Sequence, residues 1–282
     1  MEENVYTKLV GSFSEKLGND KSADDYLNAD GLLMCGICHT PKQTKITVLG
    51  QERTVFCVCK CKQEAQQQEE EAQKRKEAKE RIEAMRKKGL SESQYLNCTF
   101  DLDDGADQAA SQTCRNYVKE WEQIKDMNAG LLLLGDVGGG KTFLASCIAN
   151  ALIDQGVAVM MTTIPRLTAA MSKDFGSERI NVLNKISDAP LLILDDVGTE
   201  RNTTYGNELM YEIINTRYKA QRPLIITTNL TMTALKNPED ITYKRIYDRI
   251  TEMCTPVKVS TGGRRQQIAN IKINKLKTVL DI

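Results

Sequence analysis

The segment Gly135-Asp-Val-Gly-Gly-Gly-Lys-Thr142 fits the phosphate-binding loop pattern G-x-x-x-x-G-K-[ST]. It follows four leucines at 131–134, a run long enough only for a buried strand. It precedes apolar residues at helical spacing from Phe143 to Leu152. A loop between a strand and a helix N-terminus directs backbone N–H groups and the positive end of the helix dipole at a bound anion. The segment therefore predicts a polyphosphate site in an α/β domain.

The residue types of this loop suit a nucleoside triphosphate with Mg²⁺. Glycines let the backbone wrap the phosphates without steric clashes, Lys141 is expected to reach the β and γ phosphates, and the Thr142 hydroxyl is expected to ligate Mg²⁺. The predicted nucleotide- and Mg²⁺-binding residues are Gly135, Gly138, Gly139, Gly140, Lys141, Thr142 and Asp195.

Strand and helix patterns alternate around the loop, which predicts a mostly parallel sheet with its ligand site at the carboxyl ends of the strands. A helix is expected at 109–124, and further strands are expected at 157–162, 191–195, 224–228 and 256–260.

Polar residues that follow two of these strands predict the chemistry. Asp195 and Asp196 end one strand, and Asn229 follows another. The chain has a single histidine, His39, so proton transfer is expected to depend on carboxylates. We expect Asp195 to hold Mg²⁺ through its water shell and Asp196 to orient or deprotonate the attacking water. Asn229 is expected to present an amide near the γ-phosphate.

An N-terminal cysteine cluster predicts a zinc site. Cys35-Gly-Ile-Cys38 is followed, after a predicted hairpin with strands at 45–49 and 53–57, by Cys57-Val-Cys59-Lys-Cys61. Four thiolates match the tetrahedral coordination of Zn²⁺, and a small segment needs such a cross-link to fold. The predicted ligands are Cys35, Cys38, Cys59 and Cys61, with Cys57 and His39 as alternates; a redox role for C-x-x-C is the rival interpretation.

The composition of the chain predicts its domain limits and its location. Residues 62–88 are rich in Lys, Glu, Gln, Arg and Ala and predict a charged helical linker. We therefore expect an N-terminal zinc-binding and partner-binding domain at 1–61, a linker at 62–89 and an ATPase domain at 90–282. The N-terminal domain has one helical signal, at 5–17.

The 282-residue chain shows no signal-peptide pattern and no apolar run near 18 residues, so a cytoplasmic location with mostly reduced cysteines is expected.

Taken together, these motifs resemble the AAA+ replicative-helicase loaders of the DnaC/DnaI type, within the IstB-like ATP-binding family. The resemblance rests on the phosphate loop, Asp195-Asp196, the segment Pro223-Leu-Ile-Ile-Thr-Thr-Asn229, Arg245-Ile-Tyr-Asp-Arg249-Ile and Gly-Gly-Arg264-Arg265. It implies that Asn229 is the sensor-1 residue, Arg249 the arginine finger acting on a neighbouring subunit, and Arg265 the sensor-2 arginine. Arg245 and Arg264 are the alternatives for the last two roles.

The same resemblance implies a slow Mg²⁺-dependent ATPase that self-associates, binds a hexameric replicative helicase and helps place it on single-stranded DNA. The segment at 164–188 is the candidate DNA contact, through Arg166, Lys173, Arg179 and Lys185. Asp196 departs from the family, which usually has Glu there, and this puts robust turnover in question. A transposition-helper ATPase and a non-enzymatic zinc adaptor are the alternative functions.

Overall fold

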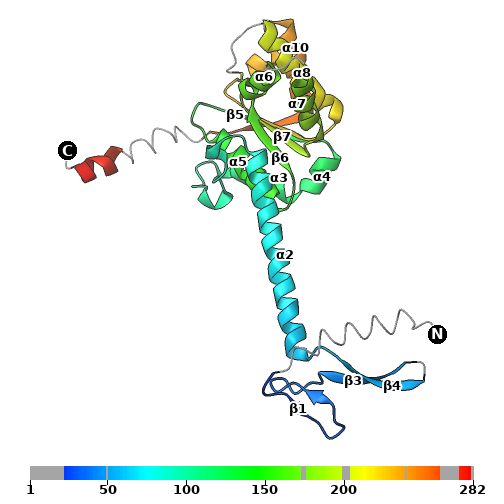
Figure 1. Ribbon diagram of the computed structural model, residues 1–282. Coiled ribbons are helices and arrows are strands. Elements are labelled where there is room, and N and C mark those ends of the chain that lie inside the picture. The colour runs from blue at the N-terminus through cyan, green and yellow to red at the C-terminus, as the bar shows by residue number, and fades with distance from the viewer. Residues whose placement is uncertain are drawn as a thin grey trace. The chain divides into compact units, whose positions relative to one another are not determined.

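The computed structural model describes residues 22–48, 50–172, 176–198, 204–238, 240–260 and 273–280. The chain divides into two compact units, residues 1–79 and residues 80–282, and the boundary falls inside the long helix α2 (Lys60–Gly89). The two units are coloured from blue to cyan and from cyan to red in Figure 1. The helix expected at 5–17 lies outside the described residues. The domain limits at 61 and 89 stay a prediction.

The N-terminal unit contains two small antiparallel ribbons. One pairs β1 (Tyr26–Leu27) with β2 (Leu33–Met34), and the other pairs β3 (Gln43–Val48) with β4 (Gln51–Phe56). The second ribbon is the hairpin expected between the cysteine pairs, and its turn contains Gly50 in the left-handed region at φ 77°. Among the described residues of this unit only Leu33, Cys35 and Cys59 are buried, so a cross-link between its loops would stabilise it.

Helix α2 has the charged composition that the sequence indicates, and none of its side chains is fully buried. Ion pairs one turn apart, such as Glu71 with Arg75 and Glu83 with Lys87, lie along its surface. Each exposed pair of this kind contributes only about 0.3–0.5 kcal/mol. Near its C-terminal end, Ile82 and Met85 pack against the core of the second unit.

The C-terminal unit is built on a five-stranded parallel sheet, as the sequence predicts. The strand order is β6-β7-β8-β5-β9, so the strand that carries the phosphate loop lies between two others. The strands are β5 (Gly130–Leu134), β6 (Val159–Thr163), β7 (Leu191–Val197), β8 (Leu224–Thr228) and β9 (Cys254–Lys258). All residues of β5 and β8 are buried, as in a parallel sheet covered on both faces.

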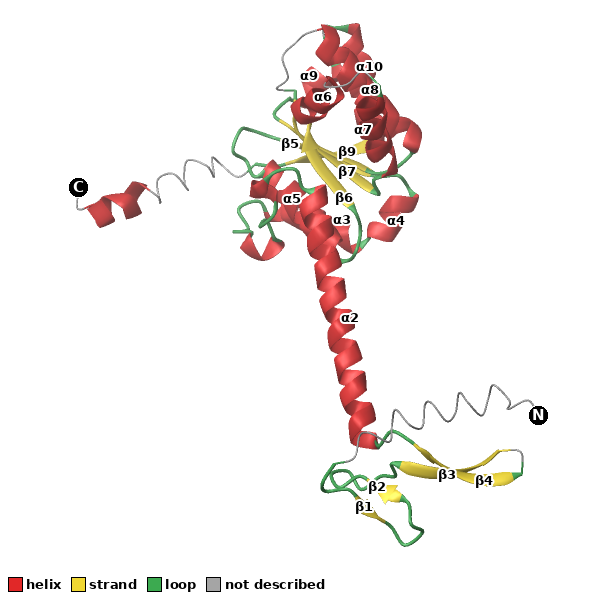
Figure 2. Ribbon diagram, in the orientation of Figure 1, coloured by secondary structure: helices red, strands yellow, loops and turns green. Residues whose placement is uncertain are grey.

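Helices cover both faces of this sheet (Figure 2). Leu131 and Leu133 belong to a core with α3 and α5, whereas Leu132 and Leu134 belong to a core with α6, α7, α8 and α10. This alternation follows from the two-residue period of a strand. The helices are α3 (Gln108–Lys119), α4 (Trp121–Asp126), α5 (Lys141–Asp154), α6 (Ile164–Ser172), α7 (Ser177–Asp188), α8 (Thr204–Ala220), α9 (Met232–Lys236) and α10 (Ile241–Met253), with short 3₁₀ turns at Ser93–Tyr95 and Phe100–Leu102.

Several sequence predictions needed correction at this level, and the strand expected at 157–162 begins at Val159 and ends at Thr163. The single helix expected at 109–124 is two helices, because Glu120 leaves the helical region at φ −97°, ψ 23° and ends α3. The strand expected at 256–260 lies two residues earlier, because its register against β5 pairs Cys254 with Gly130 and Lys258 with Leu134.

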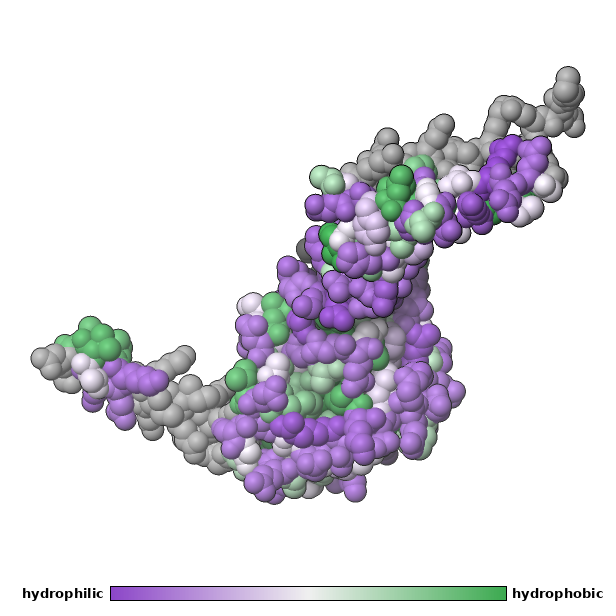
Figure 3. Space-filling model, turned by 90° about the horizontal axis from the view of Figure 1, so that it is seen from below, coloured by the Kyte–Doolittle hydropathy of each residue, from purple (hydrophilic) through white to green (hydrophobic). Residues whose placement is uncertain are grey.

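The surface on the face seen in Figure 3 is largely hydrophilic over the described residues. Exposed apolar side chains on the helical segment at 273–280 include Ile273, Leu276, Val279 and Leu280. None of the described helices combines the length and the apolar character that a membrane span requires.

A buried arginine holds together the edge of the sheet that lies opposite the carboxyl ends of the strands. Arg217 of α8 is fully buried, and its guanidinium donates to the carbonyl oxygens of Ile186, Ala189, Pro190 and Pro223 at 2.5–3.2 Å. Burial lowers the pKa of Arg217 to about 9, which leaves the group charged at neutral pH. One cation therefore satisfies carbonyl groups at the starts of β7 and β8 and at the end of α7.

We expect Arg217→Met to lower the free energy of unfolding of the C-terminal unit by about 2–4 kcal/mol, because it leaves several buried carbonyls without donors. Urea unfolding followed by circular dichroism measures the loss. Lys219→Met on the same helix is the matched control, since Lys219 is exposed. Equal stability of the two variants would contradict the role of the buried guanidinium.

Candidate functional site

The phosphate loop joins β5 to α5 through backbone conformations that favour glycine. Gly138 and Gly140 have φ of 81° and 90°, and Gly140 is the residue that precedes the first turn of α5. At Gly135 a Cβ atom would lie 2.0 Å from the carbonyl oxygen of Val259, the residue after β9. The loop is therefore shaped by its own glycines and by close packing against the neighbouring strand.

Lys141 is held at the centre of the loop. Its Nζ atom donates to the carbonyl oxygens of Gly135 and Asp136, both at 2.8 Å, and to Oδ1 of Asn229 at 2.7 Å. The residue is only 6% exposed. The acceptors in these contacts are neutral oxygens, and a lysine ammonium in a phosphate-binding loop suits an anionic ligand.

Asp195 is the most connected carboxylate of the site. It is 5% exposed, and its Oδ1 accepts hydrogen bonds from the hydroxyls of Thr142 at 2.8 Å and Thr227 at 2.6 Å. Its Oδ2 accepts from the Tyr95 hydroxyl at 3.1 Å. The Thr142 hydroxyl and the Asp195 carboxylate are the hard oxygen donors that Mg²⁺ takes at phosphate sites, so the residues fit this ion.

Asp196 differs from its neighbour in both backbone and exposure. Its φ is 56°, and the pairing of β7 with β8 is irregular between Leu194 and Val197. The Asp196 side chain is exposed, and its Oδ1 accepts from the Asn229 amide at 2.9 Å. Asn229 thus contacts both Lys141 and Asp196, so three of the residues predicted to act on the terminal phosphate lie together.

These residues line a cavity of about 600 Å³. A volume of this size is in the range of small-molecule sites. Its wall includes Gly138, Gly139, Gly140, Lys141, Thr142, Asp195, Asp196, Thr227 and Asn229. It also includes Glu92, Gln94, Tyr95 and Cys98, which the sequence analysis missed, because this polar stretch has neither a motif nor a clear periodicity.

The arginines predicted to act as the arginine finger and as sensor 2 are not among the described residues that line the cavity. Arg249 does not line the cavity within the described part of its unit. Its guanidinium lies 5.1 Å and 5.4 Å from the ring centres of Tyr211 and Tyr218 and donates to the Tyr211 hydroxyl at 3.2 Å. Arg245, the alternative finger, is exposed on α10, whereas Arg264 and Arg265 lie outside the described residues. The finger and sensor-2 roles stay predictions.

The candidate DNA contact forms α6 and α7, and two of its basic residues have acidic partners. Arg166 lies 3.9 Å from Glu92, and Arg179 forms an ion pair with Glu212. Lys185 is exposed, and Lys173 lies outside the described residues. These contacts leave less positive charge for DNA than the sequence alone indicates.

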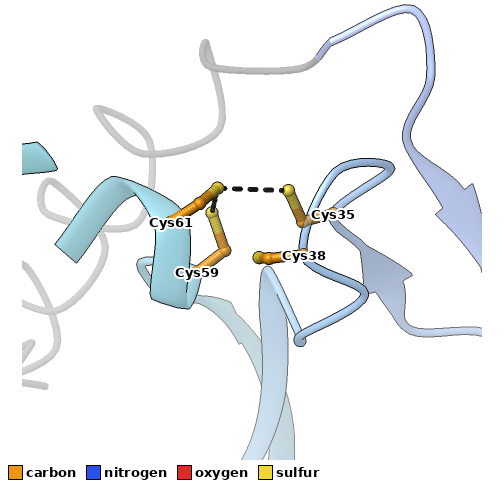
Figure 4. A group of neighbouring side chains, drawn as sticks. All are labelled: Cys35, Cys38, Cys59 and Cys61. Carbon is orange, nitrogen blue, oxygen red and sulfur yellow. Dashed lines mark hydrogen bonds between the residues drawn. The ribbon is translucent and has the colours of Figure 1, made fainter. Parts of the chain in front are cut away.

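The cysteine cluster is a candidate metal centre in the N-terminal unit. The Sγ atoms of Cys35, Cys38, Cys59 and Cys61 all lie within 4.8 Å of one another. Figure 4 shows that one pair comes from a loop and the other from the start of α2. Hydrogen bonds from the Thr40 hydroxyl and from the Cys61 backbone lower the pKa of Cys38 to about 5, whereas contacts with Cys59, Cys38 and Cys35 raise the pKa of Cys61 to about 12. Four thiols this close together can all lose their protons only beside a cation, and Zn²⁺ fits this donor set.

The two alternate ligands lie outside this group. The Cys57 thiol donates to the carbonyl oxygen of Pro41 at 3.3 Å, and burial raises its pKa. The His39 ring is tilted against Tyr26, and its Nδ1 lies 3.2 Å from the Tyr26 hydroxyl. The geometry therefore favours the four-thiol set among the candidates.

Comparisons with known proteins agree with this geometry. Residues 63–270 match the family described as IstB-like ATP binding protein. The chain is 26% identical over 184 residues to the replicative helicase loader DnaI of Bacillus subtilis and 28% identical over 166 residues to the replicative helicase loader DnaC of Escherichia coli (strain K12). These alignments cover 60% and 55% of this chain, and they span only 59% and 64% of the relatives.

A solved structure supports the fold assignment. A crystal structure of the DnaC helicase loader matches 60% of this chain and 100% of that chain, with 26% identity and a TM-score of 0.52. The predicted AAA+ ATP-binding fold is thereby confirmed.

We expect Cys59→Ser to reduce the zinc content of the purified protein far below that of the unmodified chain, because a structural zinc site needs all four ligands. Metal analysis by mass spectrometry after dialysis against a mild chelator measures it. Cys57→Ser is the matched control and should retain the metal. Zinc loss in Cys57→Ser with retention in Cys59→Ser would mean that the ligand set is wrong.

Proposed function

The chain belongs to the IstB-like ATP-binding family, and we propose that it is an ATP-hydrolysing loader of a replicative DNA helicase. The observation that carries the ATPase part is the contact chain from Lys141 through Asn229 to Asp196 inside the cavity. These contacts bring together the Lys141 ammonium, which can bind phosphates, the Asn229 amide and the exposed Asp196 carboxylate. These are the groups that phosphoryl transfer to water requires of a protein.

In this proposal each residue has a separate task. The loop backbone and Lys141 bind the phosphates, and Thr142 and Asp195 hold Mg²⁺, which compensates phosphate charge when bound. Asp196 accepts a proton from the attacking water or orients it, and Asn229 fixes the position of Asp196. The Asp196 side chain is one methylene shorter than the Glu usual in the resembled family, which is consistent with slow turnover.

Two substitutions separate binding from hydrolysis. Lys141→Ala should raise the Kd for ATP by about 10- to 150-fold, because it removes a charge-assisted contact of about 1.5–3 kcal/mol. Asp196→Asn should leave the Kd within about threefold and lower kcat by about 10²- to 10⁴-fold, because it removes only the proton acceptor. Fluorescent-nucleotide titration and single-turnover hydrolysis measure the two effects. Asp188→Asn, at the exposed end of α7, is the control for a lost surface charge. Equal loss of ATP affinity in the Lys141 and Asp196 variants would refute the assignment.

The loader part of the proposal rests on the similarity to two replicative helicase loaders. We propose that the AAA+ unit self-associates and contacts single-stranded DNA, and that the N-terminal unit with its four thiols binds the hexameric helicase. DNA contact is expected to be weak and salt-sensitive, because Arg166 and Arg179 of the candidate DNA segment already have acidic partners.

The decisive experiment mixes this chain with its host's replicative helicase on single-stranded DNA circles that carry bound single-strand-binding protein. We expect helicase-catalysed unwinding of an annealed strand to depend on this chain and on ATP. The Cys59→Ser chain should lose capture of the helicase but keep ATP binding, because the two units carry separate sites. Capture of a transposase in place of the helicase would support the transposition-helper alternative and overturn the loader function.

A further inference from the structure

The segment between α2 and α3 connects the end of the linker helix to the nucleotide cavity. The Leu90 backbone bridges to Met161 of β6, and the Ser91 N–H donates to the Met161 carbonyl oxygen at 3.1 Å. At Gly89, a Cβ atom would lie 2.0 Å from the carbonyl oxygen of Val159. The end of α2 is thus fixed against the edge strand of the sheet at backbone level.

A second set of contacts joins α2 to the same segment through a buried amide. Arg86 of α2 donates from Nε to Oδ1 of Asn150 at 2.9 Å and from Nη2 to Asp154 at 2.5 Å. Asn150 is 1% exposed, and its Nδ2 donates to the carbonyl oxygens of Tyr95 and Cys98 at 2.7 Å and 3.0 Å. Because Asn150 lies on α5, the helix of the phosphate loop, Arg86 contacts the loop helix directly and reaches the Tyr95 segment only through the Asn150 amide.

Tyr95 completes the connection. Its side chain is fully buried, and its hydroxyl donates to Oδ2 of Asp195, the oxygen that neither Thr142 nor Thr227 contacts. An ionised carboxylate only accepts hydrogen bonds, so the phenol hydroxyl is the donor in this contact. Without this bond the carboxylate loses one of the three hydroxyls that determine its orientation.

From these contacts we infer that Tyr95 is a positioning residue for the carboxylate of Asp195, and that the end of α2 holds Tyr95 in place through Arg86 and Asn150. The inference rests on the proposed function, because it assigns a purpose to the orientation of Asp195 at a Mg²⁺ and ATP site. Its consequence is that the linker helix contributes to metal-dependent nucleotide binding although it does not line the cavity within the described residues.

The test is the ratio of the Kd for ATP without Mg²⁺ to the Kd for ATP with Mg²⁺, measured by fluorescent-nucleotide titration of the full chain. Tyr95→Phe should lower this ratio by about tenfold, which is typical when a partner that orients a metal ligand is lost. Arg86→Met should lower it in the same direction by a smaller factor. The Kd for ATP without Mg²⁺ should stay unchanged in Arg86→Met, because Arg86 does not line the cavity, and any change of this Kd in Tyr95→Phe is divided out in the ratio.

Matched controls separate positioning from general loss of stability. Tyr117→Phe also removes a buried tyrosine hydroxyl, one that donates to the Ala129 carbonyl oxygen at 2.9 Å away from the cavity. Lys87→Met removes an exposed cation next to Arg86 on α2. Neither control should change the ratio, even where Tyr117→Phe lowers the melting temperature as much as Tyr95→Phe does.

An unchanged ratio in Tyr95→Phe, or in Arg86→Met, would overturn the inference, as would an equal decrease in the Tyr117→Phe control. The proposed function has a different failure. A wild-type chain that binds ATP more tightly with Mg²⁺ but neither hydrolyses it nor supports the helicase would contradict that function, while the ratio would still decide the role of Tyr95.

Discussion

The carboxylate of Asp195 is the contact on which the rest of the C-terminal unit depends. Hydroxyls from α5, from β8 and from the segment after α2 all donate to it, while its own backbone belongs to β7. A buried charge with too few donors is costly, so these four segments must meet for the unit to be stable. As a result, the phosphate loop, the candidate Mg²⁺ ligands Thr142 and Asp195, and the polar residue that follows β8 all lie at the same edge of the sheet.

Much of this arrangement was predictable because it follows from local patterns. The phosphate loop, the leucines of β5 and the paired aspartates each carry a short-range signal, and parallel strands bring the residues at their carboxyl ends together. The four cysteines were predictable for a similar reason, since two closely spaced thiol pairs across a hairpin leave few alternatives. Neither prediction needed knowledge of contacts between distant segments.

The parts that sequence reasoning missed depend on such distant contacts. Tyr95 and Asp195 are separated by 100 residues, and nothing in the stretch around Tyr95 indicates that it is buried. The aromatic contacts of Arg249 and the buried position of Arg217 are of the same kind, because an arginine in a helix is usually exposed. The break between α3 and α4 was missed because the apolar spacing continues across Glu120.

The position of the thiol group at the start of α2 has a consequence for how that helix forms. Starting a helix is unfavourable by about a factor of 10³, since several backbone angles must be fixed before the first hydrogen bond forms. Cys59 precedes α2 and Cys61 lies in its first turn. An ion bound by both would therefore fix the backbone dihedral angles of that turn before the helix extends further along the chain. Occupancy of the thiols would then act as the nucleus for the exposed part of α2, the part that precedes Ile82 and Met85.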